Sequence, residues 1–456
     1  MIKLYNSLTR TKEEFVPIGD EVKMYVCGVT VYDDSHLGHA LSSIVFDVLH
    51  RYLEFRGYKV RRVHNFTDVD DKIINRANAD GVPTEEITEK YIESFFKSMD
   101  GLNVRRATVH PRATEDMPDI ISLIQRLVDG GAAYTLDGSV YFRVRSDADY
   151  GKLSGQNIDR MLEATRHEME SGKEHAADFA LWKAAKPDEP MWDSPWGPGR
   201  PGWHIECSAM AFKHLGEQID IHGGGLDLIF PHHENEIAQS ETASGAVPFA
   251  RFFVHNGMLR TSEAWMSKSL GNVFNVNTAL EEFSADAIRL WILQSHYRTN
   301  ALLEKDLIAA AERSMRRIRQ AVEVEGAGLD ESGEAVDFRP FEKRFIEAMD
   351  DDLNTPRAIA AIFDLVRETF RGRDAGVDVS GAVEAIRELT GVLGLTLEAP
   401  PDRSGLSDAE IEALIEQRKE ARDARRWDDA DAVRDQLAES GISIADGARG
   451  TTWSRD

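Results

Sequence analysis

The stretch Met24–Phe66 carries the clearest pattern of secondary structure in the chain; it reads M-Y-V-C-G-V-T-V-Y-D-D-S-H-L-G-H-A-L-S-S-I-V-F-D-V-L-H-R-Y-L-E-F-R-G-Y-K-V-R-R-V-H-N-F. Its first residues, Met24–Cys27, form a short apolar run that predicts a buried strand. His39–Phe55 predicts an amphipathic helix, because apolar residues recur at helical spacing: Ile44, Val45, Val48, Leu49, Tyr52 and Leu53. Lys59–Phe66 predicts a second strand. A strand, a helix and a strand at this spacing form a βαβ unit, which requires a parallel sheet.

The expected helix begins at the motif H-L-G-H, His36–His39. A helix N-terminus presents backbone N–H groups without intrahelical partners, and such groups bind phosphate. Gly38 has no Cβ, so a flat nucleotide base can approach the backbone there. His36 and His39 can donate hydrogen bonds to phosphate oxygens. On its own, an H-x-G-H motif is more often an ordinary surface turn with two incidental histidines.

A second short motif, W-M-S-K-S, lies far downstream at Trp265–Ser269. Its Lys268 could supply a mobile cation for charge that develops at an α-phosphate, although such a motif alone is also typical of a polar loop. In this order, with a parallel α/β pattern between them, the two motifs resemble the ATP-binding signature pair of class I aminoacyl-tRNA synthetases. The resemblance implies an enzyme that activates an amino acid with ATP, accompanied by Mg²⁺, and passes it to tRNA.

Composition limits the class of protein. The chain has 456 residues, of which 42% are hydrophobic and 29% charged, so we expect a globular protein of several domains. We find no apolar run of about 18 residues, no signal-peptide pattern at Met1–Asn6 and no disulfide framework, so a cytoplasmic enzyme without a membrane partner is expected. The net charge of −25 argues against a general nucleic-acid coat protein. A specific RNA partner would need only a local basic face.

Changes in pattern divide the rest of the chain. The stretch Lys186–Gly202 is polar and rich in Gly and Pro, and it falls in a region that we interpret as an insertion into the sheet domain. Ile219–His222 and Phe252–His255 return as short apolar strands. From about Ala301 the pattern is helical, with a helix expected over 302–324.

Two capping signals and a linker lie in the helical part. Thr355, followed by a proline, predicts an N-cap, and Ser407 with Glu410 has the spacing of a capping box. Pro400-Pro401 marks the linker. We therefore expect the first half of a catalytic sheet domain at 1–112, the insertion at 113–200, the second half of the sheet domain at 201–300, a helical bundle at 301–399 and a small C-terminal domain at 400–456.

A candidate metal site begins with the sequence P-H-H-E-N-E. Pro231 is a plausible first residue of a helix. His232 and Glu236 are then four positions apart and share one helix face. His233 has Ile237 at the same spacing, which cannot bind a metal, so spacing favours His232.

The two cysteines complete this candidate site. Cys27 ends the first strand, and Cys207 lies in W-H-I-E-C-S. Two thiolates, one imidazole and one carboxylate suit a tetrahedral zinc ion. Taken alone, two free cysteines are more often buried core residues than ligands.

Longer motifs show a closer resemblance. The chain is similar over nearly its whole length to the cysteinyl-tRNA synthetases, and the similarity lies in Cys27–Asp33, His36–His39, Asn65–Ile74, Pro201–Met210, Ile221–Glu241, Met266–Asn272, Asp286–Trp291 and Gly450–Trp453. It implies an α/β fold with a Rossmann-type parallel sheet, an insertion in the catalytic domain and a helical C-terminal region. It also implies L-cysteine, ATP and tRNA(Cys) as substrates of a chain that we expect to be a monomer.

Position by position, the resemblance implies roles for residues of this chain. It places zinc, to which the thiolate of the substrate adds, on Cys27, Cys207, His232 and Glu236. It places the amino acid pocket at Gly28, Thr67, Trp203 and His222. It places ATP at His36, Gly38, His39, Asp227 and Lys268, of which His36, His39 and Lys268 are the implied catalytic residues.

The chain departs from the family pattern at three positions. Trp265 stands where the family commonly has a lysine, so we expect no phosphate role there; Val29 and Leu41 stand where proline and arginine are common. One alternative is a relative that activates cysteine but joins it to an amino sugar, as in mycothiol biosynthesis. Such an enzyme would lack the C-terminal tRNA-binding tail. A non-catalytic tRNA-binding relative would be expected to lose metal ligands or Lys268.

The tail carries a basic cluster near an aromatic residue. The cluster consists of Arg418, Lys419, Arg422, Arg425 and Arg426, and it is followed by Trp427 and Arg434. Such residues could bind phosphates and stack a base. They could also form a solvated helix face paired with acidic neighbours such as Glu416 and Glu420. The resemblance favours a role in anticodon binding.

Overall fold

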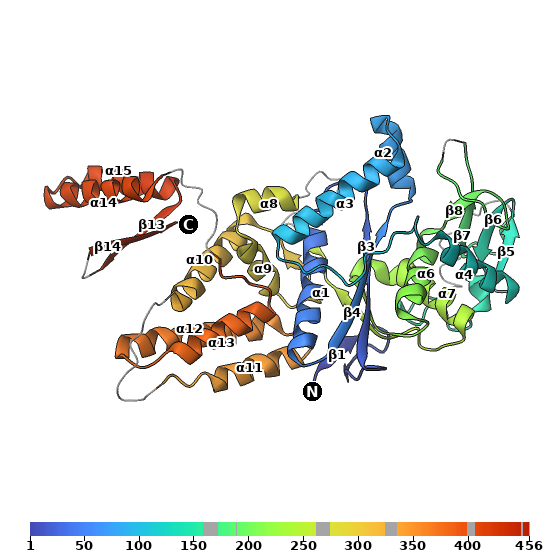
Figure 1. Ribbon diagram of the computed structural model, residues 1–456, viewed down its shortest axis with the longest axis horizontal. Coiled ribbons are helices and arrows are strands. Elements are labelled where there is room, and N and C mark those ends of the chain that lie inside the picture. The colour runs from blue at the N-terminus through green and yellow to red at the C-terminus, as the bar shows by residue number, and fades with distance from the viewer. Residues whose placement is uncertain are drawn as a thin grey trace.

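The computed structural model describes residues 1–157, 172–187, 189–260, 274–323, 335–398, 406–447 and 450–455. A parallel sheet with strand order β10-β9-β3-β4 lies at its centre (Figure 1). Its strands are β3 (Glu21–Thr30), β4 (Lys59–Thr67), β9 (Ile219–Gly225) and β10 (Ala250–Asn256). Helix α1 (Leu37–Phe55) joins β3 to β4, so the expected βαβ unit is present.

The alternation of side chains along β3 explains how the sheet is covered on both faces. Met24 and Val26 belong to a hydrophobic core that includes most of α1. Tyr25 and Cys27 belong to a second core on the other face, which α4 (Met117–Asp129) and α6 (Trp203–Leu215) cover. Because successive strand residues point to opposite faces, Cys27 necessarily faces α6.

The insertion forms a small sheet of its own, beside α6 and α7 (Glu234–Ser244) in Figure 1. Four antiparallel strands follow α4 in the order β5-β6-β7-β8, and they span Ala133–Leu136, Ser139–Phe142, Phe179–Ala184 and Gly199–Pro201. Strand β8 leads directly into α6. The other elements of the N-terminal half are β1 (Lys3–Asn6), β2 (Thr11–Glu14), α2 (Asp71–Asp80) and α3 (Thr84–Gly101).

Helices dominate the second half of the chain. Beside the sheet domain lie β11 (Leu259–Arg260), α8 (Val276–Glu282), α9 (Ala285–Leu293), β12 (Ala301–Leu302), α10 (Lys305–Val322), α11 (Arg339–Asp350), α12 (Thr355–Ala375) and α13 (Ser380–Val392). The N-cap expected at Thr355 is wrong by one residue. Asn354 caps α12 by accepting a hydrogen bond from the N–H of Arg357, whereas the Thr355 hydroxyl donates to the carbonyl of Leu293.

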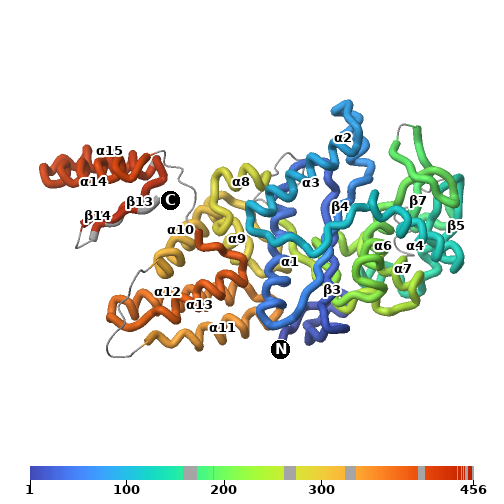
Figure 2. The backbone as a smooth tube through the Cα atoms, viewed as in Figure 1, coloured from blue at the N-terminus to red at the C-terminus, as the bar shows by residue number. Residues whose placement is uncertain are grey.

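A C-terminal unit stands apart from these helices, as the red part of Figure 2 shows. It consists of α14 (Asp408–Asp423), α15 (Trp427–Glu439), β13 (Ile442–Gly447) and β14 (Gly450–Arg455) around a small core of its own. The capping box of Ser407 and Glu410 is present. Pro400-Pro401 lies outside the described residues. No helix in the described part of the chain is both long and apolar enough to cross a membrane.

Candidate metal and nucleotide sites

Gly28 brings the carboxyl end of β3 close to β4. The pairing register of the two strands shifts between Val26 and Val29, and a Cβ on Gly28 would lie 1.5 Å from the carbonyl oxygen of Asn65. Only glycine fits there. The Gly28 N–H donates to Asn65 Oδ1 at 2.8 Å, which fixes the backbone directly after Cys27.

Four predicted ligands meet at the end of this strand. Cys27 Sγ lies 3.8 Å from Cys207 Sγ and 3.4 Å from Glu236 Oε1. His232 Nε2 lies 3.5 Å from Cys207 Sγ and 3.1 Å from Glu236 Oε1. All four side chains are buried, and their ligand atoms lie within 4.8 Å of one another. They come from β3, α6, α7 and the turn before α7.

These distances fit a tetrahedral zinc ion. Zn–S bonds of about 2.3 Å and Zn–N or Zn–O bonds of about 2.0–2.1 Å require S···S near ~3.8 Å, S···N and S···O near ~3.5 Å, and N···O near ~3.3 Å. The measured separations of 3.8, 3.5, 3.4 and 3.1 Å lie close to these values. The four residues are therefore spaced as ligands of one small cation.

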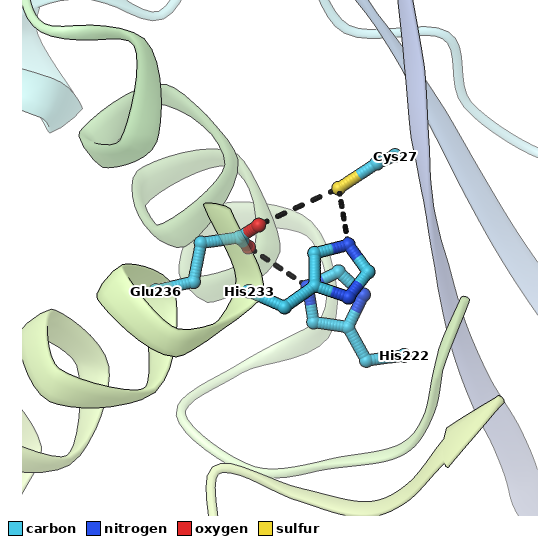
Figure 3. Close-up of side chains that lie close together, drawn as sticks. All are labelled: Cys27, His222, His233 and Glu236. Carbon is cyan, nitrogen blue, oxygen red and sulfur yellow. Dashed lines mark hydrogen bonds and ion pairs between the residues drawn. The ribbon is translucent and has the colours of Figure 1, made fainter. Parts of the chain in front are cut away.

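Two further histidines, His222 and His233, lie beside Cys27 and Glu236 (Figure 3). Cys27, His222, His233 and Glu236 form a second group that could hold a metal. However, His222 Nε2 lies 2.8 Å from Glu236 Oε2, which is a hydrogen bond and is shorter than the ~3.3 Å between two ligands of one zinc. His233 Nε2 lies 3.3 Å from Cys27 Sγ, and its Nδ1 lies 2.9 Å from His255 Nε2. We therefore assign His222 and His233 to the surrounding hydrogen-bond shell.

The helix expected to begin at Pro231 begins at Glu234 instead. Ile229–His233 forms a wider π turn, in which Phe230 has an extended backbone. This turn is why both histidines reach the cluster, although regular helical spacing favoured His232 alone. His232 Nδ1 lies 2.9 Å from His204 Nδ1, which orients the ring so that Nε2 faces Cys207.

Burial controls protonation in the cluster. It raises the pKa of the Cys27 thiol well above its usual value, and Cys207 and Glu236 act in the same direction. It also lowers the pKa of His232 and of His233 well below the ordinary value, with neighbouring imidazoles adding to the effect. Both imidazoles are therefore neutral and have a lone pair for a metal. A bound cation would favour the thiolate forms that burial alone disfavours.

Other predicted pocket residues line this end of the sheet. The Trp203 ring stacks on His232 at 4.2 Å and remains 39% exposed. Thr67 ends β4 and is buried. The sequence interpretation gave no role to Glu206, which is fully buried beside Cys207 and whose pKa burial raises well above the usual range. The sequence feature that could have indicated a role for Glu206 is its position directly before Cys207 in W-H-I-E-C-S.

The two histidines of H-L-G-H form the N-terminal cap of α1. His36 Nδ1 accepts hydrogen bonds from the N–H groups of Gly38 and His39, at 3.1 and 3.3 Å. His39 Nδ1 accepts from the N–H of His36 at 3.4 Å, and the two rings stack at 3.7 Å. Two of the amides that we expected to be available to phosphate are thus occupied. Since each Nδ1 is an acceptor, each neutral ring carries its proton on Nε2 and can donate from there.

The chain that follows W-M-S-K-S returns to the same cap. The N–H of Leu37 donates to the carbonyl of Phe274 at 3.0 Å, and His36 pairs with Asn275. Lys268 and Trp265 lie outside the described residues. Asp227 is exposed in the turn after β9, at the carboxyl edge of the sheet, where parallel α/β folds bind ligands.

Much of the basic cluster in the tail is paired with carboxylates. Arg418 makes two hydrogen bonds of 2.9 Å to Asp446, and Arg422 contacts the same carboxylate. Lys419 and Arg434 pair with acidic neighbours on their own helices, and Arg426, which directly precedes α15, pairs with Asp429 of that helix. The Trp427 side chain is 58% exposed. Pairing thus lowers the positive charge that the sequence suggested, and the indole remains available for stacking.

Three family models match the chain. The first is described as the catalytic domain of class I (C) tRNA synthetases and matches residues 14–313. The second is described as a DALR domain and matches 344–398. The third is described as the cysteinyl-tRNA ligase anticodon binding domain and matches 405–453.

Individual proteins agree with these matches. The cysteine–tRNA ligase of Dehalococcoides mccartyi is 48% identical over 456 residues, which cover 99% of each chain. That of Alkalilimnicola ehrlichii is 49% identical over 469 residues, with full coverage of both chains. Among solved structures, Mycobacterium tuberculosis methionyl-tRNA synthetase in complex with methionyl-adenylate matches with a TM-score of 0.60 and 15% identity, over 87% of this chain and 96% of that one. At this identity the likeness shows a shared fold.

Proposed function

Because the chain belongs to the family of cysteine–tRNA ligases, we propose that Cys27, Cys207, His232 and Glu236 hold a zinc ion that recognises the thiol of the substrate. The chain is an ATP-dependent ligase that joins cysteine to tRNA and releases AMP and pyrophosphate. The observation that carries the zinc proposal is the match of the ligand separations to a tetrahedron. When bound, zinc would supply a Lewis acid that prefers thiolate to hydroxyl, which would favour cysteine over serine.

Residues around the cluster would form the amino acid pocket. We propose that Gly28, Thr67, Trp203 and His222 line it, since all four lie on elements that carry or contact metal-ligand candidates. The exposed part of Trp203 would cover the bound amino acid and exclude water. His222 holds Glu236 through Oε2, which leaves Oε1 directed at Cys27 Sγ and His232 Nε2.

The nucleotide would lie across the start of α1. We propose that His36 and His39 donate from Nε2 to ATP phosphates, that Gly38 lets the base approach and that Asp227 contacts the adenosine. Lys268 would neutralise charge at the α-phosphate, and Mg²⁺ would accompany ATP. The hydrogen bond from Leu37 to Phe274 supports this arrangement, because it brings the chain after W-M-S-K-S to the same helix end.

The remaining parts of the proposal concern the whole chain. We propose the five segments given above as its domains, with residues 400–456 reading the anticodon of tRNA(Cys), and a monomer in the cytoplasm. The amino-sugar ligase is not favoured, because the anticodon-binding family model matches 405–453.

One assay pair tests the zinc proposal directly. Zinc is removed with a chelator, and cysteine-dependent pyrophosphate exchange is measured before and after zinc is restored. Exchange should vanish with the metal and return with it. Full exchange activity in protein shown by elemental analysis to hold no zinc would contradict the proposal.

A further inference from the structure

A loop of the insertion grips the first turn of the helix that carries Glu236. The loop Tyr150–Ser154 lies about 80 positions from that helix in sequence, and its Gly151 N–H and Ser154 N–H donate to the carboxylate of Glu234 at 3.0 and 2.7 Å. The N–H of Leu153 donates to the same carboxylate at 3.3 Å. Three backbone donors thus converge on one side chain, which is 1% exposed.

The loop is shaped for this contact. Gly151 has φ +98°, a value that favours glycine, and a Cβ there would lie 2.1 Å from the carbonyl oxygen of Gln156. Successive N–H groups in such a turn form a concavity that binds anions. The anion here is Glu234 of the chain itself, so the concavity holds a protein side chain.

Neighbouring contacts tie the same helix to the loop. The Tyr150 hydroxyl donates to Asn235 Oδ1 at 2.5 Å, and Asn235 is 2% exposed. Lys152 forms an ion pair with Glu241, two turns further along α7. Glu234 and Glu236 are two positions apart, about 200° around the helix, so their carboxylates lie on opposite sides. One side faces the loop, and the other faces Cys27 and His222.

We propose that Glu234, gripped by the loop Tyr150–Ser154, is a positioning residue for the metal centre. It fixes the first turn of α7 and thereby holds Glu236 where the other three ligands require it. This inference rests on the proposed zinc site. It also gives the insertion a role in amino acid recognition, although none of its residues from 113 to 157 is among the four ligands.

The test compares zinc retention in three full-length variants with the parent enzyme. Glu234→Gln places an amide N–H₂ among N–H donors, and Tyr150→Phe removes only the bond to Asn235. Ser154→Ala is the matched control, because it removes a side-chain hydroxyl of the loop, which within the described part of the chain accepts only from the N–H of Gln156, and leaves the backbone contacts to Glu234 intact. Each zinc-loaded protein is mixed with EDTA, and the rate of zinc release is followed together with the KM for cysteine.

Glu234→Gln should release zinc about tenfold faster or more, since partners that orient ligands commonly contribute 10–100-fold to metal affinity. Tyr150→Phe should show a smaller increase in the rate of zinc release. If Glu234→Gln does not fold, this variant alone tests the inference. The control should stay within about twofold of the parent. Zinc should also raise the Tm of Glu234→Gln by less than it raises that of the parent, which a purely structural contact would not cause.

Unchanged zinc release in Glu234→Gln would overturn the inference. If Glu234→Gln does not fold, unchanged zinc release in Tyr150→Phe would overturn it. So would an equal loss of Tm with and without zinc. A parent enzyme that holds no zinc would instead contradict the proposed function itself. The two failures are therefore distinguishable.

Discussion

At the residue scale, Cys207 offers the sharpest test of the ligand set. Its Sγ contacts both Cys27 and His232, at 3.8 and 3.5 Å. Cys207→Ser should lose zinc and cysteine-dependent pyrophosphate exchange together, because a hydroxyl is a poor zinc ligand. Thr242→Ala, which removes a hydroxyl at an exposed position of α7, is the control and should keep both. Retention of one zinc per chain in Cys207→Ser would contradict the assignment.

His36 combines two tasks that one substitution can separate. Its Nδ1 caps α1, and its Nε2 is the proposed phosphate donor. Asparagine is a good N-cap, so His36→Asn should keep the Tm but lower kcat for pyrophosphate exchange about 10²-fold. His36→Ala should also lower the free energy of unfolding by about 1 kcal/mol. Equal kcat in His36→Asn and the parent would show that the ring acts only as a cap.

His110 makes stability depend on pH. Its Nδ1 donates to the carbonyl of His64 at 2.9 Å, and its Nε2 accepts from the N–H of Ala107 at 3.0 Å, so the folded protein needs the neutral ring. Burial, with the charges of Arg62 and Arg106, lowers its pKa to about 4. The unfolded chain takes up that proton near the ordinary pKa of about 6.5, so stability should fall as the pH drops from ~6.5 towards 4. The Tm of His110→Gln should decrease less than that of the parent between pH 7 and pH 5. Parallel Tm curves would contradict this.

At the scale of elements, the sequence predicted those parts that rest on local pattern. The strand, helix and strand around H-L-G-H follow from apolar periodicity, and the box at Ser407 and Glu410 follows from capping chemistry. The cap at Asn354 was missed because the Thr355 hydroxyl finds a tertiary partner, the carbonyl of Leu293. Local spacing cannot foresee such a competing contact.

The metal cluster, too, was predictable from the sequence only in part. Residue types and the resemblance predicted the four ligands, and the structure brings them together. His233 reaches Cys27 through a π turn that regular spacing does not contain. The grip on Glu234 comes from backbone amides 83 positions away at Gly151, and backbone donors leave no pattern in a sequence.

At the scale of the whole molecule, the C-terminal unit should be separable from the chemistry. It has its own core, and neither the proposed zinc ligands nor the cap of α1 lie in it. Deleting residues 402–456 should leave cysteine-dependent pyrophosphate exchange nearly intact, whereas aminoacylation of tRNA(Cys) should fall sharply. Equal loss of both reactions would show that the unit stabilises the catalytic part of the chain. Unchanged aminoacylation would show that the tRNA is recognised elsewhere.

We propose that this enzyme recognises cysteine through a zinc ion on Cys27, Cys207, His232 and Glu236. X-ray absorption at the zinc edge tests it most directly, because it counts the sulfur atoms bound to the metal. The zinc-loaded enzyme should show two sulfur neighbours at about 2.3 Å, and three after addition of L-cysteine. L-Serine, the matched control, should leave the count at two. A sulfur count that does not change with L-cysteine would contradict recognition of the substrate thiol by the zinc ion.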